Sequence, residues 1–574
     1  MKSLVLALVM TGVLGAQTQV RRATVLPSYK DLKFPPLPAL KVPEPTEITL
    51  SNGMKVFLLE DHELPLINGT ALVRTGNLFD PPDKKGLAGL TGDVMRSGGT
   101  HAKTGDQLDQ ELENVAASVE SSIGESAGTL SFNCLKENAD QVLGIFKDLL
   151  SAPEFRQDKV ELSKTQIRSE ISRRNDDAHG IAEREFSSIL YGRNTPYGWE
   201  VEYSDIDHIQ RQDLIDFYKR YYFPANVELG IYGDFSIPEM KAKLERIFGD
   251  WKVTQPPVPA FPKVEEKAAP GIFLADKDDV TQTFFDIGTL GGELRDKDYP
   301  ALEVAAEILG GGFSSRLFRN VRTEHGWAYN IGASWSARYD HPGAFHISGS
   351  TQSAHTVDTL KAVQEEVEKI RTSEVSDEEL QTAKDTVLNG FVFFFDRPSK
   401  TLNRLMQYEY YSYPRDFIFQ YQKAVAAVTK ADVLRVAKER FRPEAFTYVA
   451  VGNPKQFGTP LSALNMKVEA IDLTIPEPKP ASAKTDAASL EKGKELLAKV
   501  QQSLGGPAKL AGVKDLQYDA DVELQSPGGP AMKAKQTNSY LFPATMRQEI
   551  NLPFGKQSIY SDGNSGWLAG MQGV

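Results

Sequence analysis

The chain has 574 residues, too many for one hydrophobic core, so several domains are expected. Its apolar and charged fractions, 41% and 25%, are those of an ordinary soluble protein. The formal net charge is -12 and no long run of Lys or Arg occurs, which argues against nucleic acid as a partner because phosphate binding depends on clustered basic side chains.

The N-terminus predicts export. Residues 1–16 combine Lys2 with an apolar run from Leu4 to Leu14 and end in small residues, which is the pattern of a secretory signal peptide. The expected location is therefore outside the cytoplasm, in the periplasm. The apolar run is too short to span a bilayer comfortably, and no later segment approaches about 20 continuous apolar residues, so no membrane span is predicted. An uncleaved N-terminal anchor is the alternative.

The next feature is a predicted helix, Gly86–Met95, with two glycines in one turn, Gly89 and Gly92. A glycine inside a helix costs about 0.5 to 1 kcal/mol relative to alanine, so the pair suggests a close approach to something. Two interpretations stay open. The helix packs tightly on a sheet of its own lobe, or the glycines widen a groove for a peptide.

The body of the chain repeats itself at an offset of about 219 residues. Tyr218–Pro224 aligns with Ala437–Pro443, and each follows the start of a helix and precedes an apolar strand. Two long segments of helical spacing and two strands of period two align upstream: Phe155–Ile171 with Val375–Phe391, and Gly128–Cys134 with Gly343–Ser348. The repeat predicts an α+β fold of two homologous lobes, each an antiparallel sheet with helices on one face.

Proline-rich stretches mark the boundaries between the predicted parts. The first lobe spans residues 45–253, a semi-rigid linker spans 254–270, and the second lobe spans 271–472. A flexible linker rich in Pro, Ala and Lys covers 473–488, and a tail covers 489–574. Two similar lobes joined in this way can face each other as a clamshell and enclose a chamber.

In the second lobe a glycine loop precedes a predicted helix: Gly310, Gly311 and Gly312. These glycines either contact substrate backbone or make a tight turn. The helix carries Arg322, the chain turns at Gly326, and Tyr329 lies in the strand that follows. From spacing alone, Arg322 is predicted to be a basic residue at the C-terminal end of a helix, where the helix dipole favours a positive charge. Tyr329 is predicted to be a buried residue of the strand.

The tail begins with a helix whose apolar positions suit packing on a sheet: Leu490, Leu496, Leu497, Val500 and Leu504. Alternating segments follow, separated by turn sequences at Pro527–Gly529 and Asp562–Asn564. We expect a mainly β domain that is incomplete. Over this short stretch it loosely resembles the start of the half-open barrels of periplasmic lipoprotein carriers.

From about Pro45 to Asp472 the chain resembles the insulinase and pitrilysin family of zinc metallopeptidases, which includes the mitochondrial processing peptidase. The resemblance rests on four motifs: Leu50–Val56, Gly86–Ala88, Gly98–Thr100 and Gly310–Leu317. It implies a clamshell of two lobes in which one lobe holds zinc and peptides are cut in the chamber.

The resemblance places the family's metal-binding motif, His-x-x-Glu-His, on residues that cannot serve as that motif. Its histidines fall on Gly89 and Asp93, its glutamate falls on Gly92, and the distal ligand falls on Glu170. A catalytic zinc takes three protein ligands, usually with imidazole among them, whereas Asp93 and Glu170 offer two carboxylates and no base between them. The chain is thus identified as a member without the zinc motif, and no metal or other cofactor of its own is expected.

In the family, an arginine and a tyrosine at the positions of Arg322 and Tyr329 reach across the chamber to the zinc-bearing lobe. There they hold the substrate carbonyl and stabilise the oxyanion, so the resemblance implies a role in supporting the transition state. It makes Gly310 to Gly312 weaker candidates for binding substrate.

The preferred interpretation is the non-catalytic subunit of an exported heteromeric zinc metalloendopeptidase. Zinc is then expected in a partner, a family paralogue with the intact motif that forms a heterodimer with this chain. The peptide substrate is expected to add as a strand to a sheet edge around Ser122–Phe132.

The alternative is a peptide-binding or scaffold protein with no role in cleavage, which has no reason to retain the arginine and tyrosine pair. An independent peptidase needs another metal site. His341 and His346 lack helical zinc spacing and are expected at the surface or in a turn.

Overall fold

The computed structural model describes residues 42–265, 269–477, 487–524, 532–552 and 555–569. They belong to two compact units, and the division falls between Glu477 and Pro478. The predicted signal peptide lies outside the described residues, as does most of the linker predicted at 473–488.

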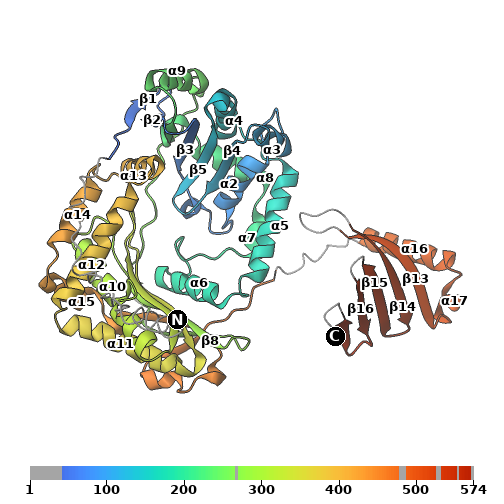
Figure 1. Cartoon of the computed structure of the whole chain (residues 1–574). Helices are drawn as coiled ribbons and strands as arrows, with labels where there is room; N and C mark the ends of the chain where they lie inside the picture. The colour runs from blue at the N-terminus through green and yellow to red at the C-terminus, as the bar shows by residue number, and fades with distance from the viewer. Residues whose placement is uncertain (1–41, 266–268, 478–486, 525–531, 553–554, 570–574) are drawn as a thin grey trace, which may run out of the picture. The chain divides into compact units, whose positions relative to one another are not determined.

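The first unit contains two six-stranded sheets that repeat the same arrangement (Figure 1). The strand orders are β1-β2-β6-β3-β5-β4 and β12-β7-β11-β8-β10-β9, so β2 to β6 have counterparts in β7 to β11. The first sheet consists of Thr46–Thr49 (β1), Lys55–Glu60 (β2), Leu66–Arg74 (β3), Ser118–Ile123 (β4), Ala127–Leu135 (β5) and Val227–Gly233 (β6). The second consists of Gly271–Asp276 (β7), Gln282–Leu290 (β8), Ala328–Ser336 (β9), Ala344–Gln352 (β10), Thr447–Gly452 (β11) and Val468–Ala470 (β12).

Pairing within both sheets is mostly antiparallel, with a parallel pair in equivalent places, β2 with β6 and β7 with β11. The predicted α+β fold of two homologous lobes is therefore confirmed. We call the part built on β1 to β6 the first lobe and the part built on β7 to β12 the second lobe.

Helices cover one face of each sheet. Those of the first lobe are Leu87–Ser97 (α2), Gly105–Glu113 (α3), Ala139–Ser151 (α4), Gln157–Arg173 (α5), Tyr203–His208 (α7), Arg211–Tyr221 (α8) and Ile237–Phe248 (α9). Those of the second lobe are Tyr299–Gly310 (α10), Thr356–Thr372 (α11), Asp377–Gly390 (α12), Phe417–Ala427 (α14) and Lys430–Arg440 (α15). The long helices expected at 155–171 and 375–391 are α5 and α12.

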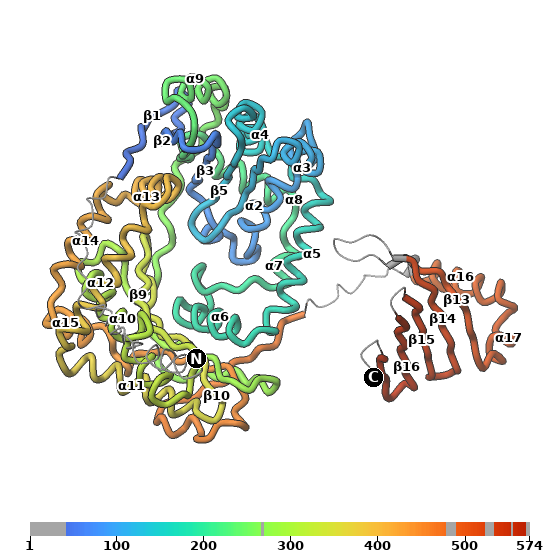
Figure 2. The backbone as a smooth tube through the Cα atoms, in the orientation of Figure 1, coloured from blue at the N-terminus to red at the C-terminus, as the bar shows by residue number. Residues whose placement is uncertain are grey.

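Two further helices cross between the lobes, which the sequence analysis did not anticipate (Figure 2). Helix α6 (Ala178–Tyr191) leaves the first lobe and packs Phe186 and its apolar neighbours on β8 and β11 of the second sheet. Helix α13 (Pro398–Tyr410) leaves the second lobe and packs Leu402 and Met406 on β2 and β6 of the first. Each sheet is thus covered on both faces, which explains why every residue of β11 is buried.

The contact of α13 with the first sheet includes a buried acid, Glu228 of β6. Burial, and secondarily the charge of Glu409 on α13, raise the pKa of Glu228 to about 8, while Lys55 opposes the shift. Lys55 itself pairs with Glu409 across the interface. The pKa of Tyr410 on the same helix is also raised by burial.

This arrangement predicts a pH dependence that Glu228→Gln removes. Because the folded pKa lies above the ordinary value of 4.5, the wild type loses stability as the pH rises from about 4.5 to about 8. We expect Glu228→Gln to be equal to the wild type in free energy of unfolding at pH 4 and up to about 5 kcal/mol more stable at pH 9. Urea unfolding at both pH values measures this, and a constant difference between the two proteins would contradict it.

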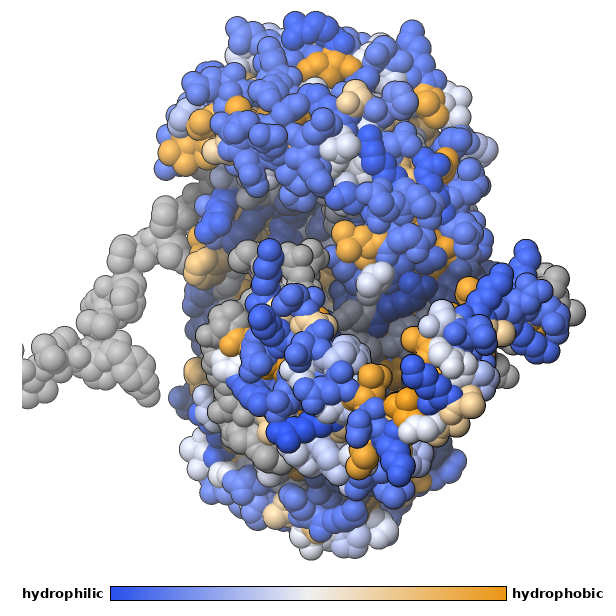
Figure 3. All heavy atoms as spheres, turned by 90° about the vertical axis from the view of Figure 1, so that its right-hand side faces the viewer, coloured by the Kyte–Doolittle hydropathy of each residue, from blue (hydrophilic) through white to orange (hydrophobic). Residues whose placement is uncertain are grey.

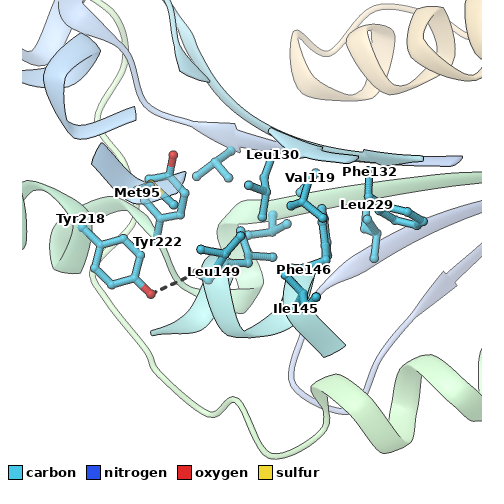
Figure 4. Packing of buried hydrophobic residues seen from close by; sticks show 14 of the residues in the cluster. Met95, Val119, Leu130, Phe132, Ile145, Phe146, Leu149, Tyr218, Tyr222 and Leu229 are labelled. Atoms are coloured by element: carbon cyan, nitrogen blue, oxygen red, sulfur yellow. Dashed lines mark hydrogen bonds between the residues drawn. The ribbon is translucent and has the colours of Figure 1, made fainter. Parts of the chain in front are cut away.

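The core of the first lobe joins α2, α4 and α8 to the sheet (Figure 4). Burial alternates residue by residue along β5, so that Leu130, Phe132 and Cys134 face the helices. Phe132 meets Phe146 of α4 edge-on at 5.0 Å. The predicted period-two strand therefore forms as expected, and Met95 at the end of α2 belongs to the same core.

The second unit is an open five-stranded antiparallel sheet preceded by two helices, Ala487–Ser503 (α16) and Pro507–Ala511 (α17). Its strands are Asp515–Leu524 (β13), Met532–Leu541 (β14), Thr545–Leu552 (β15), Gly555–Ser561 (β16) and Gly566–Ala569 (β17). The leucines and valine predicted to pack on the sheet are 46% to 65% exposed, so that prediction is wrong. The turn at 562–564 is present, with Gly563 at a φ of +87°, whereas 527–529 lies outside the described residues.

Within the described ranges no helix is long and apolar enough to cross a bilayer. The face seen in Figure 3 is mostly hydrophilic, with hydrophobic residues scattered over it.

Candidate functional site

Helix α2 carries the positions of the absent zinc motif, and its first turn is held by a buried aspartate. Asp80 accepts hydrogen bonds from the backbone N–H groups of Gly86 (2.8 Å) and Ala88 (2.9 Å). Burial outweighs these bonds and raises the pKa of Asp80 to about 7. Gly86 precedes the helix with a φ of +90°, a conformation that side chains other than glycine rarely adopt.

The two glycines of α2 have different surroundings, and only Gly92 fits the interpretation of close packing on the sheet. A Cβ at Gly92 would lie 2.4 Å from the backbone nitrogen of Ile123 in β4, and the hydroxyl of Ser121 donates to the carbonyl of Gly92 (2.5 Å). A Cβ at Gly89 would meet nothing within 4 Å. Gly92 therefore serves close packing of helix on strand, whereas Gly89 faces open space.

A cavity of about 500 Å³ lies beside Gly89, and Asp93 and Glu170 both line it. The structure thus brings together the sequence-predicted residues on α2 and α5. Burial, and then the nearby charge of Glu170, raise the pKa of Asp93. Two carboxylates that repel each other, with no imidazole beside them, are a poor zinc site. Among the described residues no group of three or more His, Cys, Asp and Glu side chains could hold a metal.

The opposite wall of this cavity is an ion-pair network that the sequence analysis missed. Arg174 pairs with Glu202 at 2.8 Å, and Arg184 lies 3.4 Å from Glu200. Burial, and then the charge of Glu185, raise the pKa of Glu200. The residues come from the end of α5, from α6 and from the loop after α6, and no motif in the sequence marks them as neighbours.

The structure also brings Arg322 and Tyr329 together. Arg322 lies in a π-helical turn, Phe318–Glu324, and its guanidinium carbon is 4.6 Å from the ring centroid of Phe318 and 4.7 Å from that of Tyr329. Gly326, at a φ of +68°, turns the chain into β9. Tyr329 is 78% exposed, so its interpretation as a core strand residue is wrong. The described residues supply no carboxylate partner to Arg322.

The glycine loop is partly structural. A Cβ at Gly310 would lie 2.1 Å from the nitrogen of Ala333, so this glycine lets α10 pack on β9. Gly311 lies against the carboxylate of Glu307, and Gly312 has only that carboxylate near it, at 3.9 Å. The next residue, Phe313, is 81% exposed. Only the end of the loop is therefore open to a ligand.

His341 and His346 of the second lobe belong to the contact between lobes. His341 is only 5% exposed, bonds Asp340 at 2.8 Å and packs against Tyr197 at 4.5 Å. His346 bonds Asp286 and stacks on Phe186 of α6. His341 lies in the turn between β9 and β10, as one of the two predicted alternatives has it, but side chains from the first lobe cover it. His346 lies within strand β10 and is only partly exposed, so the prediction is wrong for His346.

The sheet edge beside α2 is β4, the outermost strand of the first sheet. Most of the predicted range, 122–132, is β5, which pairs on both sides and offers no free edge. The equivalent outermost strand of the second sheet is β9, which carries Tyr329.

The contrast between the two glycines gives a matched prediction. We expect Gly92→Ala to destabilise the protein by about 1 to 3 kcal/mol, because its Cβ meets backbone that cannot move aside. Gly89→Ala is expected to stabilise it by up to about 1 kcal/mol through helix propensity. Urea unfolding of both variants measures the difference, and equal effects would contradict the assignment.

Comparison with known proteins gives a family. Residues 61–202 match the family model described as insulinase (peptidase family M16), and residues 208–387 match the one described as peptidase M16 inactive domain. An uncharacterized zinc protease of Rickettsia felis is 24% identical over 343 residues, which cover 58% of this chain and 80% of the relative. The non-peptidase homolog YmxG of Helicobacter pylori is 25% identical over 410 residues, 70% of this chain and 92% of the relative.

Solved structures show the same fold. The peptidase M16 inactive domain from Pseudomonas fluorescens superposes with a TM-score of 0.64 at 22% identity and covers 73% of this chain and all of its own. A protease from Helicobacter pylori gives a TM-score of 0.63 at 19% identity, over 72% of this chain and all of its own. With two adjacent family models matched over both lobes, the chain belongs to the insulinase family, peptidase family M16.

Proposed function

We propose that this protein is the non-catalytic subunit of an exported, heteromeric zinc metallopeptidase. One observation carries the proposal. Arg322 and Tyr329 are stacked on the second lobe, Tyr329 exposed and Arg322 half-buried, while the metal position of the first lobe has no imidazole and no base. A donor pair without a metal site of its own fits a chain that completes the site of another.

In this proposal the partner is a paralogue with the intact His-x-x-Glu-His motif, and its zinc supplies the activated water. The guanidinium of Arg322 stacks on the rings of Phe318 and Tyr329, and stacking leaves its N–H groups free to donate. It donates to the substrate carbonyl oxygen, and the hydroxyl of Tyr329 donates beside it as negative charge develops. The free edge of β9, next to Tyr329, holds the peptide as an added strand.

The export that we propose rests on the N-terminal pattern of residues 1–16, which supports a periplasmic location. The names of the relatives, a zinc protease and a non-peptidase homolog, support a family in which both active and inactive members occur.

The test mixes this chain with a purified paralogue that has the motif and follows cleavage of quenched peptides. We expect the mixture to cleave, with chelator-sensitive turnover well above that of either chain alone. Stoichiometric zinc and turnover in this chain purified by itself would overturn the proposal, as would a mixture no faster than the paralogue.

A second function, peptide binding without cleavage, is favoured by β4 and β9, each of which is a terminal strand of its sheet. It predicts that the chain alone binds extended peptides in a fluorescence anisotropy titration, and that Tyr329→Phe leaves this binding unchanged while the mixture gains no peptidase activity.

A further inference from the structure

The linker before the second lobe lies in a groove on the first lobe. Arg220 donates to the carbonyl oxygens of Pro256 and Pro257, both at 3.0 Å. Phe261 stacks on Phe79 at 5.2 Å, and the guanidinium of Arg74 lies 4.4 Å from the Phe261 ring. Prolines have no N–H but keep their carbonyl acceptors, so an arginine at the rim suits such a segment.

The second lobe has an equivalent groove. Two pairs of positions correspond between the lobes. Arg74 is the last residue of β3, and Leu290 is the last residue of the equivalent strand β8. Tyr221 is the last residue of α8, and Arg440 is the last residue of the equivalent helix α15. Leu290 and Arg440 both line a cavity of about 530 Å³ in the second lobe. Its other walls include the apolar Pro342 and Ala445 and the exposed Arg442. Arg440 donates to the carbonyl of Gly291, and the exposed Arg442 adds a second guanidinium to the lining.

The sequence contains a second copy of the linker motif. Pro256–Phe261 reads Pro-Pro-Val-Pro-Ala-Phe, and Pro35–Leu40 reads Pro-Pro-Leu-Pro-Ala-Leu. The copies are separated by about 220 residues, the period of the internal repeat. Each copy precedes the first strands of one lobe.

The described chain starts close to the groove of the second lobe. Glu47 of β1 pairs with Arg415, in the loop between α13 and α14. Tyr413, two residues earlier in that loop, receives a hydrogen bond from Arg295, the neighbour of the cavity residue Asp296. From Glu47 back to Leu40 an extended chain covers up to about 24 Å.

We propose that residues 35–40 dock in the groove of the second lobe that Leu290, Pro342, Arg442 and Ala445 line. The segment that precedes the second lobe packs on the first lobe. By the same symmetry, the segment that precedes the first lobe packs on the second lobe, just as α6 and α13 each pack on the other lobe's sheet. Leu37 and Leu40 take the places of Val258 and Phe261, and Arg442 donates to the prolyl carbonyls. This inference is independent of the proposed peptidase role.

The test uses the full chain with pairs of introduced cysteines and a short bismaleimide. The native Cys134 is buried, and burial raises the pKa of its thiol to about 11, so it stays unreactive. The test pair is Leu40→Cys with Leu290→Cys. The positive control is the equivalent pair of the first lobe, Phe261→Cys with Arg74→Cys, and the negative control is Leu40→Cys with Lys361→Cys on the exposed face of α11.

We expect the test pair to cross-link at a rate within about threefold of the positive control and at least tenfold faster than the negative control. In a second arm, Leu37→Asp with Leu40→Asp is expected to speed amide hydrogen exchange in residues 289–298. A test pair that reacts no faster than the negative control, while the positive control reacts, overturns the proposal. So does unchanged exchange in the double variant.

Discussion

Arg322→Ala is expected to lower kcat of the mixed peptidase by about 100- to 1000-fold, which corresponds to about 2.7 to 4 kcal/mol of transition-state stabilisation. In the proposed role the guanidinium donates to the developing oxyanion, and its contacts with the rings of Phe318 and Tyr329 limit the reorganisation that this requires. Tyr329→Phe keeps the stacked ring and removes only the hydroxyl, and we expect a smaller loss, about 10- to 100-fold. Steady-state cleavage of a quenched peptide by the mixture measures both.

The matched control is Arg319→Ala. Arg319 is half exposed, lies in the same π-helical turn and faces Glu379 at 3.6 Å, away from the pair. Its replacement is expected to change kcat less than twofold. If Arg322→Ala and Arg319→Ala slow the mixture equally, the loss reflects general damage to the helix and the assigned role is wrong.

The second large effect is on stability. Leu402→Ala is expected to lower the free energy of unfolding by about 2 to 5 kcal/mol, because Leu402 is 2% exposed and packs with Met406 and Phe57 where α13 covers the first sheet. The contact is close, since a Cβ at Gly230 on β6 would lie 2.3 Å from the sulfur of Met406. Urea unfolding followed by circular dichroism measures the loss.

Leu162→Ala on α5 provides the control, because Leu162 is 52% exposed on the same unit. It is expected to change stability by less than about 0.5 kcal/mol. If both substitutions lower the free energy of unfolding equally, α13 does not cover the first sheet in solution.

Local pattern was enough to predict most of the fold. The alternation of β5 and the helical spacing of α5 and α12 depend on neighbours in sequence, and so does the repeat that predicts two equal sheets. The packing of α6 and α13 on the opposite lobes was not predictable, because the sequence of an apolar helix face does not indicate which sheet the helix will cover. The exposed leucines of α16 show the same limit, since their spacing predicts a partner surface that the described part of the second unit does not provide.

The sequence predicted which residues belong to the candidate site better than it predicted what surrounds each of them. The resemblance placed Asp93 and Glu170 in one cavity and Arg322 beside Tyr329, as the structure has them. The different roles of Gly89 and Gly92 depend on where β4 crosses α2, and the burial of His341 depends on Tyr197 of the other lobe. Tertiary packing sets the distances between segments that are far apart in sequence, so the spacing of residues along the chain does not predict them.

The crossing of α6 and α13 makes the two lobes interlocked folding partners. Cleavage of the proline-rich linker would leave each fragment with one apolar sheet face exposed to water. Neither fragment would therefore be expected to stay monomeric. These two contacts consequently oppose any wide separation of the lobes, since separation would expose both apolar sheet faces to water.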